Sequence, residues 1–129
     1  MVYHVYYYCP ICGNLIEMVE NSGVVPVCCG KPMEHLEAGT HDGSAEKHVP
    51  SVKCDGRNVT VRVGELPHPM QPGHYIRFVC LHTTLGCHRR MLEPDDEPLA
   101  AFYLDEEEIP LCAYEYCTVH GLWKKEMNI

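Results

Sequence analysis

Cysteine and histidine are unusually abundant in this chain, which has nine of each among its 129 residues. Thiolate and imidazole are the side chains that bind zinc, iron and copper most readily. An odd number of cysteines argues against a framework made only of disulfides. The first residues contain no basic segment followed by a long apolar one, so no signal peptide is predicted. The sequence therefore favours a metalloprotein of a reducing compartment, and we expect a cytoplasmic location.

The charge balance excludes several kinds of partner. The formal net charge is −8 at pH 7. Such an acidic chain has little electrostatic attraction for nucleic acid or for an anionic lipid surface, so neither partner is expected. No apolar run approaches the roughly 20 residues that span a bilayer, and no transmembrane segment is predicted.

The cysteines are concentrated toward the N-terminal end, where residues 1–36 hold four of the nine. Small, polar and turn-forming residues follow at 37–44, which predicts a linker. About 37 residues cannot bury a core large enough for independent stability, so the first part needs a metal or a partner. We therefore expect two domains, residues 1–37 and residues 38–129.

Short runs of β-branched and aromatic residues, separated by ten prolines and ten glycines, predict an all-β fold. In Val59–Val63 the valines alternate with polar residues and so share one face of a strand. We expect a small metal-clipped sheet followed by a sandwich of antiparallel strands. The acidic segment Asp105–Glu108 predicts a solvated loop. The predicted strands are 5–8, 15–19, 24–27, 59–63, 75–81, 99–104 and 111–116.

Four cysteines of the first domain have the spacing of a metal site. Cys9 and Cys12 form a CxxC segment, and Cys28 and Cys29 follow after fifteen intervening residues. Four thiolates suit tetrahedral zinc or iron. A purely structural zinc site and a disulfide pair are the alternatives. Neighbouring side chains diverge, so Cys28 and Cys29 can bind one ion only if the backbone or the tetrahedron is distorted.

Three later segments contain histidines that could share a second metal ion. They are Glu46–Pro50, His68–Ile76 and Cys117–Trp123. Cys117 and His120 have C-x-x-H spacing, and a turn rich in proline and glycine separates His68 from His74. Neutral imidazoles with one thiolate suit iron, zinc or copper. Spacing alone does not show that the three segments meet, and an isolated histidine is more often a surface or core residue than a ligand.

The order and spacing of these motifs over residues 9–123 resemble desulfoferrodoxin, the two-iron form of superoxide reductase. Residues 1–37 resemble its desulforedoxin-like module, and residues 38–129 its neelaredoxin-like module. The resemblance implies a rubredoxin/desulforedoxin-like first domain, an immunoglobulin-like antiparallel β-sandwich, and a homodimer. It also implies two iron centres in each chain. The implied ligands are Cys9, Cys12, Cys28 and Cys29 in the first centre, and equatorial His48, His68, His74 and His120 with axial Cys117 in the second.

The resemblance further implies a one-electron reduction of superoxide to hydrogen peroxide at the second centre, with a rubredoxin-like protein as the electron donor. In that scheme Lys47 attracts the superoxide anion, and Glu46 occupies the vacant position of the resting ferric iron. Formal charges agree, because ferrous iron with four imidazoles and one thiolate is positive, whereas ferrous iron with four thiolates is negative and repels an anion. An exposed ion pair between Glu46 and Lys47 is the structural alternative.

Some residues depart from the resemblance or lie outside it. Thr118 stands where the family usually has asparagine after the axial cysteine. The other cysteines have no role in the resemblance, and we expect most of them to be small buried hydrophobic residues; they are Cys54, Cys80, Cys87 and Cys112. The alternative functions are a rubredoxin-like electron-transfer protein without substrate binding, a zinc-stabilised binding module, and superoxide dismutation.

Overall fold

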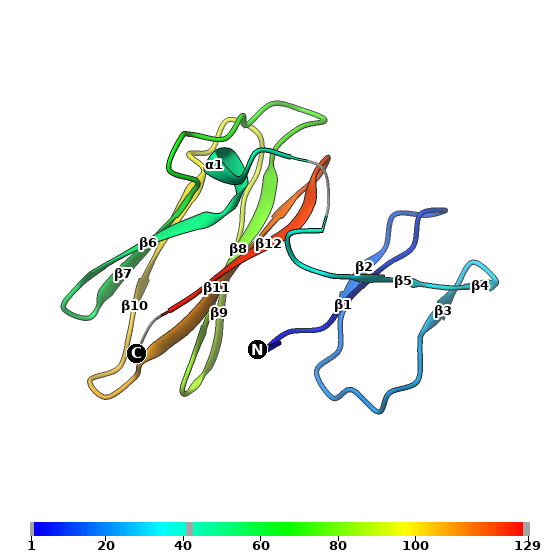
Figure 1. The fold of residues 1–129 in the computed structure, drawn as a ribbon, viewed down its shortest axis with the longest axis horizontal. Coiled ribbons are helices and arrows are strands. Elements are labelled where there is room, and N and C mark those ends of the chain that lie inside the picture. The colour runs from blue at the N-terminus through cyan, green and yellow to red at the C-terminus, as the bar shows by residue number, and fades with distance from the viewer. Residues whose placement is uncertain (1, 41–42, 128–129) are drawn as a thin grey trace. The chain divides into compact units, whose positions relative to one another are not determined.

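The computed structural model describes residues 2–40 and 43–127, so His41 and Asp42 of the predicted linker lie outside the described residues. The chain divides into two compact units, residues 1–37 and residues 38–129. Nearly all regular elements are strands (Figure 1), which confirms the all-β prediction. Among the described residues, no helix has the length and apolar character needed to cross a bilayer.

The first unit contains one three-stranded antiparallel sheet and one short hairpin. Its strands are β1 (Tyr6–Tyr8), β2 (Leu15–Glu17), β3 (Val27–Cys28), β4 (Lys31–Pro32) and β5 (Glu34–Leu36). β1 is the central strand between β2 and β5, and β3 pairs with β4. Tyr7, Cys9 and Met33 form one small buried cluster in this unit. The strand predicted over 24–27 was wrong for its first three residues, because Pro26 has no N–H to offer a sheet partner.

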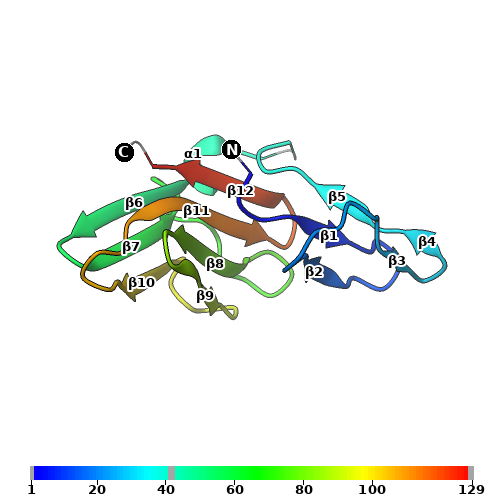
Figure 2. The same ribbon diagram turned by 90° about the horizontal axis from the view of Figure 1, so that it is seen from below.

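The second unit is a sandwich of one three-stranded and one four-stranded antiparallel sheet (Figure 2). The first sheet has the order β10-β7-β6 and the second the order β12-β11-β8-β9. This division of seven strands is that of an immunoglobulin-like sandwich, as expected. The elements are α1 (Ala45–His48), β6 (Pro50–Asp55), β7 (Asn58–Val63), β8 (Ile76–Thr83), β9 (Gly86–Met91), β10 (Leu99–Tyr103), β11 (Pro110–Cys117) and β12 (Gly121–Glu126).

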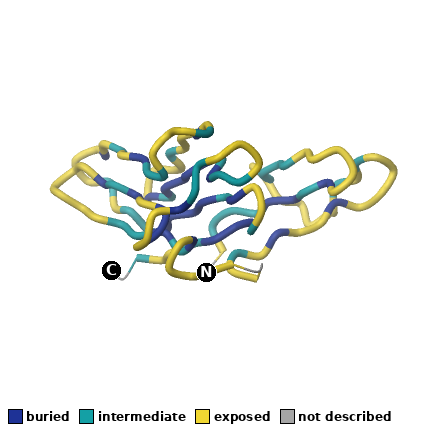
Figure 3. The backbone as a smooth tube through the Cα atoms, turned by 90° about the horizontal axis from the view of Figure 1, so that it is seen from above, coloured by how far each residue is buried: buried dark blue, intermediate teal, exposed yellow. Residues whose placement is uncertain are grey.

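The core lies between these two sheets. Val59, Val61 and Val63 of β7 are almost completely buried, in one cluster with Val79 and Leu81 of β8. Burying each such side chain contributes about 1.5–3 kcal/mol to stability. Most buried residues of this unit lie in its strands, whereas the turns of its hairpins are exposed (Figure 3). The alternation of valines in the sequence therefore identified the correct inward face.

Strand register brings three connecting segments of the second unit to one end of the sandwich. The end of β7 pairs with the start of β6, which directly follows α1, through Val63 and Pro50. The end of β11 pairs with the starts of β8 and β12, because Cys117 lies opposite both Ile76 and Gly121. Helix α1, the β7–β8 loop and the β11–β12 turn are therefore neighbours, although they are far apart in sequence.

Two sequence expectations about side chains need correction. Cys80 and Cys87 are joined by a disulfide, whereas the sequence analysis expected only small buried hydrophobic residues there. Cys54 and Cys87 are exposed, whereas Cys80 and Cys112 are buried as expected. Glu108 is not solvated, because its side chain is only 4% exposed and accepts hydrogen bonds from the Thr83 hydroxyl and the Asp105 N–H.

Candidate metal centres

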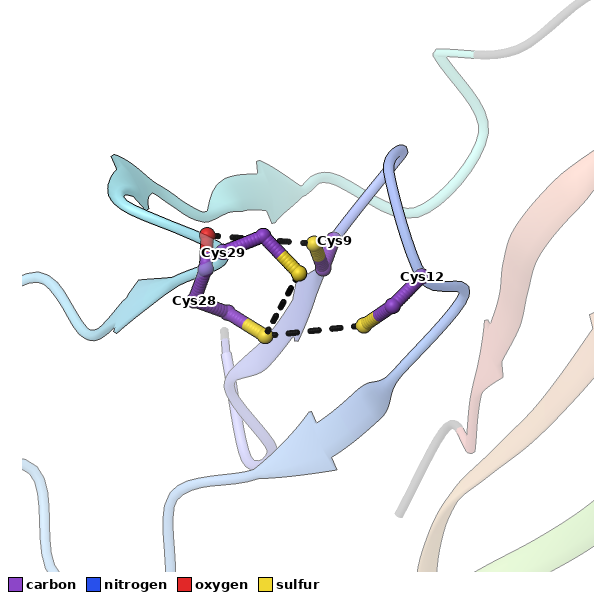
Figure 4. Close-up of side chains that lie close together, drawn as sticks. All are labelled: Cys9, Cys12, Cys28 and Cys29. Carbon is purple, nitrogen blue, oxygen red and sulfur yellow. Dashed lines mark hydrogen bonds between the residues drawn. The ribbon is translucent and has the colours of Figure 1, made fainter.

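The four cysteines of the first unit converge on one point. Their sulfur atoms all lie within 4.8 Å of one another. The sulfurs of Cys12 and Cys28 are 3.5 Å apart, and those of Cys28 and Cys29 are 4.0 Å apart (Figure 4). A tetrahedral site with metal–sulfur distances of about 2.3 Å has sulfur–sulfur edges of about 3.8 Å. We call Cys9, Cys12, Cys28 and Cys29 the cysteine cluster, and its size fits a tetrahedral metal ion.

A tight turn explains how two adjacent cysteines can face the same ion. Cys28 pairs with Lys31, so Cys29 and Gly30 are the two central residues of the β3–β4 hairpin. Both have positive φ, 54° and 74°, as a type I′ turn requires. The left-handed backbone at Cys29 turns its side chain toward that of Cys28, as Figure 4 shows. The backbone distortion that the sequence required is therefore present at Cys29.

The thiols of the cysteine cluster influence one another's ionisation. Hydrogen bonds from the backbone of Cys12 lower the pKa of Cys9 to about 7. The pKa of Cys29 is raised to about 12, chiefly by its interaction with the Cys12 side chain. Four thiolates this close repel one another, so full deprotonation needs a neutralising cation.

A second group of donor atoms lies at the end of the sandwich described above. His48 comes from α1, His68 and His74 come from the β7–β8 loop, and Cys117 ends β11. The donor atoms of these four residues, which we call the histidine–cysteine cluster, lie within 4.8 Å of one another. The Nε2 atom of His68 is 3.1 Å from Nε2 of His48 and 3.3 Å from the Cys117 sulfur. His48, His68 and Cys117 are buried, and His74 is half-buried.

Backbone acceptors fix the protonation of two of these imidazoles. Nδ1 of His48 donates to the Ser44 carbonyl at 2.7 Å, and Nδ1 of His68 donates to the Pro69 carbonyl at 2.6 Å. Each Nε2 therefore presents a lone pair inward. Burial lowers the pKa of His68 to about 4, which keeps this ring neutral at pH 7. Neutral imidazole is the form that binds metals.

The inner nitrogens of the histidine–cysteine cluster are not all satisfied by hydrogen bonds. The Nε2 lone pairs of His48 and His68 face each other, and Nε2 of His74 is buried without a hydrogen-bond partner. Buried polar atoms in folded proteins are almost always satisfied. Burial also raises the pKa of the Cys117 thiol, while N–H groups of His120 and Val119 oppose this. A bound cation would satisfy all four donors, so the residues fit a metal site.

His120 borders the histidine–cysteine cluster. The centroid of its ring lies 4.8 Å from that of His48 and 5.1 Å from that of His74, although its ring nitrogens are not among the donor atoms grouped above. The His120 N–H donates to the Cys117 sulfur at 3.3 Å. Trp123 donates from Nε1 to the His120 carbonyl at 2.9 Å, and its ring stacks on that of His48. Trp123 is thus a supporting residue to which the sequence analysis gave no role.

Glu46 and Lys47 are exposed residues of α1, directly before His48. The positive charge of Lys47 contributes to the lowered pKa of His74, after the larger effect of burial. Glu46 lines a cavity of about 470 Å³ together with Ser51 and Lys125. Lys47 is therefore electrostatically close to the cluster, whereas the carboxylate of Glu46 is not one of the grouped donors.

One further acidic residue was missed by sequence analysis. Glu115 lies on β11, two residues before Cys117, and is fully buried. Neither carboxyl oxygen has a hydrogen-bond partner among the described residues. Burial raises the pKa of Glu115 well above its ordinary value, which favours the neutral form of this side chain. A lone glutamate in a strand gives no sequence signal for such an environment.

The fold and the two clusters define a non-haem metalloprotein with two candidate centres. Two family models match the chain: Desulfoferrodoxin over residues 40–126, and Desulfoferrodoxin, N-terminal domain, over residues 3–36. The chain belongs to the desulfoferrodoxin family, which confirms the resemblance. A desulfoferrodoxin homologue of Archaeoglobus fulgidus is 41% identical over 118 residues, which are 92% of this chain and 93% of that protein.

Solved structures of superoxide reductases are also similar to this protein. The enzyme from Treponema pallidum matches with a TM-score of 0.81 and 34% identity, covering 97% of this chain and all of that one. The one-iron superoxide reductase of Giardia intestinalis matches with a TM-score of 0.57 and 33% identity. This match covers 65% of the present chain and 99% of the Giardia chain.

Thr118 joins two segments that carry cluster residues. Its hydroxyl accepts a hydrogen bond from the Tyr75 N–H at 3.1 Å, and its own N–H donates to the Tyr75 carbonyl at 3.0 Å. Tyr75 follows His74, and Thr118 follows Cys117. The side chain at this position therefore holds the β7–β8 loop against the β11–β12 turn.

Replacing Thr118 by valine is expected to loosen the second centre without unfolding the protein. Valine keeps the shape but removes the acceptor, and one lost hydrogen bond of this kind costs about 0.5–1.5 kcal/mol. We expect metal release to a chelator to accelerate about threefold to tenfold, which is that cost expressed as a rate ratio. Thr118→Ser keeps the hydroxyl and should release metal at the wild-type rate. Equal release rates for all three proteins would contradict this role.

Proposed function

We propose that this protein is a superoxide reductase that converts superoxide to hydrogen peroxide by one-electron reduction at an iron bound in the second unit. The observation that carries the proposal is the inward-facing set of His48, His68, His74 and Cys117, whose donor atoms converge within 4.8 Å and include the buried, unpartnered Nε2 of His74. The superoxide reductases of Treponema pallidum and Giardia intestinalis share this fold. We include His120 as the fifth ligand because its ring borders those of His48 and His74.

The protein's own residues prepare this site for an anionic substrate. When bound, ferrous iron supplies the electron that superoxide takes up. The Nδ1–H bonds of His48 and His68 hold the rings with Nε2 inward, so these ligands are in place before metal binds. The N–H of His120 donates to the Cys117 sulfur and thereby stabilises its thiolate form. Cys117 contributes negative charge that favours the oxidised state of the centre.

Lys47 provides the positive charge outside the cluster. It is exposed on α1, next to His48, in a protein whose net charge is otherwise strongly negative. An anion approaching this end of the sandwich is attracted locally by the Lys47 ammonium group. The Nζ–H groups of Lys47 can also donate hydrogen bonds to water molecules that take part in product release. We propose that the Glu46 carboxylate binds at the open face of the centre once the product has left.

Replacing Lys47 by alanine is expected to slow association with superoxide by about tenfold and to flatten its dependence on ionic strength, because electrostatic steering is lost. The matched control is Lys53→Ala, which makes the same change in net charge at an exposed position of β6. Rates measured by pulse radiolysis at several salt concentrations distinguish the two variants. If Lys53→Ala lowers the rate as much as Lys47→Ala, a specific role for Lys47 is excluded.

The cysteine cluster is proposed to bind a second iron with an electron-transfer or structural role. Its four thiolates would repel superoxide, so reduction is assigned to the other centre. The Giardia one-iron enzyme, which covers 65% of this chain, is consistent with a reductase that needs only part of the present length. A rubredoxin-like donor and a homodimer remain predictions. Exposed Val19, Val24 and Val27 of the first unit offer apolar surface for such a dimer, which sedimentation equilibrium would detect.

Cys12→Ser is expected to remove the iron of the cysteine cluster and to leave superoxide reduction within about twofold of the wild type, because the two units have separate cores. The control is Cys54→Ser, which changes an exposed thiol outside both clusters and should keep two irons per chain. Iron content and reduction of pulse-generated superoxide are measured together. Loss of reductase activity in Cys12→Ser, with the second iron still bound, would contradict this division of roles.

The decisive experiment combines metal content, product and ligand binding on the purified protein. We expect two irons per chain, hydrogen peroxide without oxygen as the product of superoxide, and a spectral change at the histidine–cysteine centre on adding azide. Oxygen evolution would indicate dismutation. No spectral response to azide together with no superoxide turnover would indicate an electron-transfer protein. A colourless, zinc-loaded protein would contradict the proposal altogether.

A further inference from the structure

The disulfide between Cys80 and Cys87 lies outside both metal clusters and contributes little to holding the fold. It joins β8 to β9 with Cα atoms 6.6 Å apart and a sequence separation of only seven. These two strands are already paired at six positions, from Phe78 with Met91 to Thr83 with Gly86. A disulfide stabilises a protein most when it closes a long loop. This bond therefore adds little constraint to a hairpin that forms without it.

The two sulfur atoms differ in their access to solvent. Cys80 is 0% exposed, whereas Cys87 is an exposed residue. Cys87 also forms part of the wall of a cavity of about 150 Å³, together with His88 and Glu108. A cavity of this size admits hydrogen peroxide or a small thiol. Thiol–disulfide exchange requires direct attack on one sulfur, so Cys87 is the atom that reagents reach and Cys80 is its internal partner.

The cavity favours uncharged reagents. Asp105 and Glu108 both line it. Hydrogen bonds from the Thr83 hydroxyl, the Asp105 N–H and His88 lower the pKa of Glu108 to about 2, so its carboxylate is charged at neutral pH. Negative charge beside the accessible sulfur repels anions and does not affect neutral molecules such as hydrogen peroxide. The surroundings therefore select the reagent by its charge.

We propose that Cys80 and Cys87 form a reversible dithiol–disulfide site, which hydrogen peroxide oxidises and small uncharged thiols reduce. The peroxide source rests on the proposed function, because superoxide reduction releases hydrogen peroxide from the same protein. The site would thus consume one equivalent of hydrogen peroxide, and the disulfide would form when this product accumulates.

The oxidation proceeds in two balanced steps. The Cys87 thiolate attacks one oxygen of hydrogen peroxide, so an S–O bond forms, the O–O bond breaks and hydroxide leaves to become water. The Cys80 thiol then attacks the Cys87 sulfur, so the S–S bond forms, the S–O bond breaks and a second water leaves with the Cys80 proton. The two thiols lose two electrons and two protons in total. Two molecules of an uncharged thiol reverse this oxidation and become a disulfide themselves.

The experiment uses the full-length protein with its iron in the ferric state. The folded protein is treated with 2-mercaptoethanol, freed of reductant, exposed to one equivalent of hydrogen peroxide, alkylated and digested with trypsin. The tryptic peptide Phe78–Arg89 contains Cys80 and Cys87 and no other cysteine. We expect both of them to be alkylated after reduction and neither after peroxide. In Cys87→Ser, Cys80 should stay alkylated after peroxide, and Cys54→Ser should behave as the wild type.

Two results would overturn the proposal. One is that Cys80 and Cys87 can still be alkylated after peroxide treatment. The other is that their disulfide cannot be reduced until the protein unfolds. The charge argument is tested by reducing the pair with 2-mercaptoethanol and with anionic 2-mercaptoethanesulfonate. We expect the uncharged thiol to react several-fold faster than the anionic one. The Glu108→Gln substitution should narrow the difference between these two reduction rates. Equal rates with both thiols in the wild type would contradict selection by charge.

A parallel sample separates this proposal from the proposed function. The reduced protein is supplied with superoxide and an electron donor, with and without catalase. Oxidation of the pair that catalase prevents, together with one peroxide formed per superoxide and no oxygen in the sample without catalase, supports both proposals. If added peroxide oxidises the pair but superoxide yields oxygen, as in dismutation, the proposed function fails. If added peroxide does not oxidise the pair, the dithiol proposal fails whatever the result with superoxide.

Discussion

Replacing Cys117 by serine is expected to lower the rate of superoxide reduction by roughly a hundredfold or more, because the change removes a proposed ligand rather than one of its supporting partners. Cys117 is the only donor in the histidine–cysteine cluster that can carry negative charge. A serine hydroxyl is neutral at pH 7 and a poor ligand for ferrous iron. We also expect the visible absorption of the oxidised second centre to disappear, since it depends on the thiolate. Stopped-flow spectroscopy and iron content measure both effects.

The matched control for this substitution is Cys112→Ser. Cys112 is equally buried on the same strand, β11, and lies outside both clusters. This control places a hydroxyl in the interior at a cost of about 1–3 kcal/mol but should keep the spectrum and the rate of the wild type. A wild-type rate in Cys117→Ser, or an equal loss of activity in Cys112→Ser, would exclude Cys117 as an essential ligand.

Gly64→Ala is expected to displace helix α1 and with it His48. A Cβ atom at residue 64 would lie 2.7 Å from the Glu46 carbonyl oxygen and 2.9 Å from the Lys47 carbonyl carbon. Both are backbone atoms, so the helix must move to relieve the overlap. Overpacking of this kind costs about 1–3 kcal/mol. We expect a lower free energy of unfolding. We also expect at least tenfold faster metal release, which is the size of effect seen when residues that support a metal ligand are changed.

Val61→Ala is the control that separates loss of stability from loss of the site. Val61 is fully buried in the sandwich core, and truncating it leaves a cavity. We expect a comparable decrease in stability, measured by urea denaturation, but wild-type metal release from the folded protein. If Val61→Ala releases metal as fast as Gly64→Ala, global stability rather than the position of α1 controls the site.

The sequence predicted strands wherever apolar and polar residues alternate clearly along the chain. Val59, Val61 and Val63 identified β7, and the apolar run over 75–81 identified most of β8. Strand β9 was missed because Gly86–Met91 is an edge strand with charged residues and no apolar alternation. Helix α1 was missed because four residues are too few to show a helical period. Local pattern therefore identified the central strands better than the edges.

The metal clusters were less accessible to sequence reasoning than the strands. The spacing of Cys9 and Cys12 indicates a site on its own. His48 and Cys117 are distant in sequence, and only the register of β7, β8 and β11 places their segments together. The resemblance to desulfoferrodoxin supplied this information in advance. The bond between Cys80 and Cys87 was not predictable, because it depends on the hairpin register of β8 and β9.

The turn at Cys29 shows a conflict between backbone preference and function. Asparagine and glycine adopt its left-handed conformation readily, whereas cysteine does so at an energetic cost. A chain selected only for hairpin stability would not have a sulfur atom at this position. The cysteine at this position therefore agrees with the proposed metal binding, and a relative whose first unit binds no metal is expected to tolerate asparagine there.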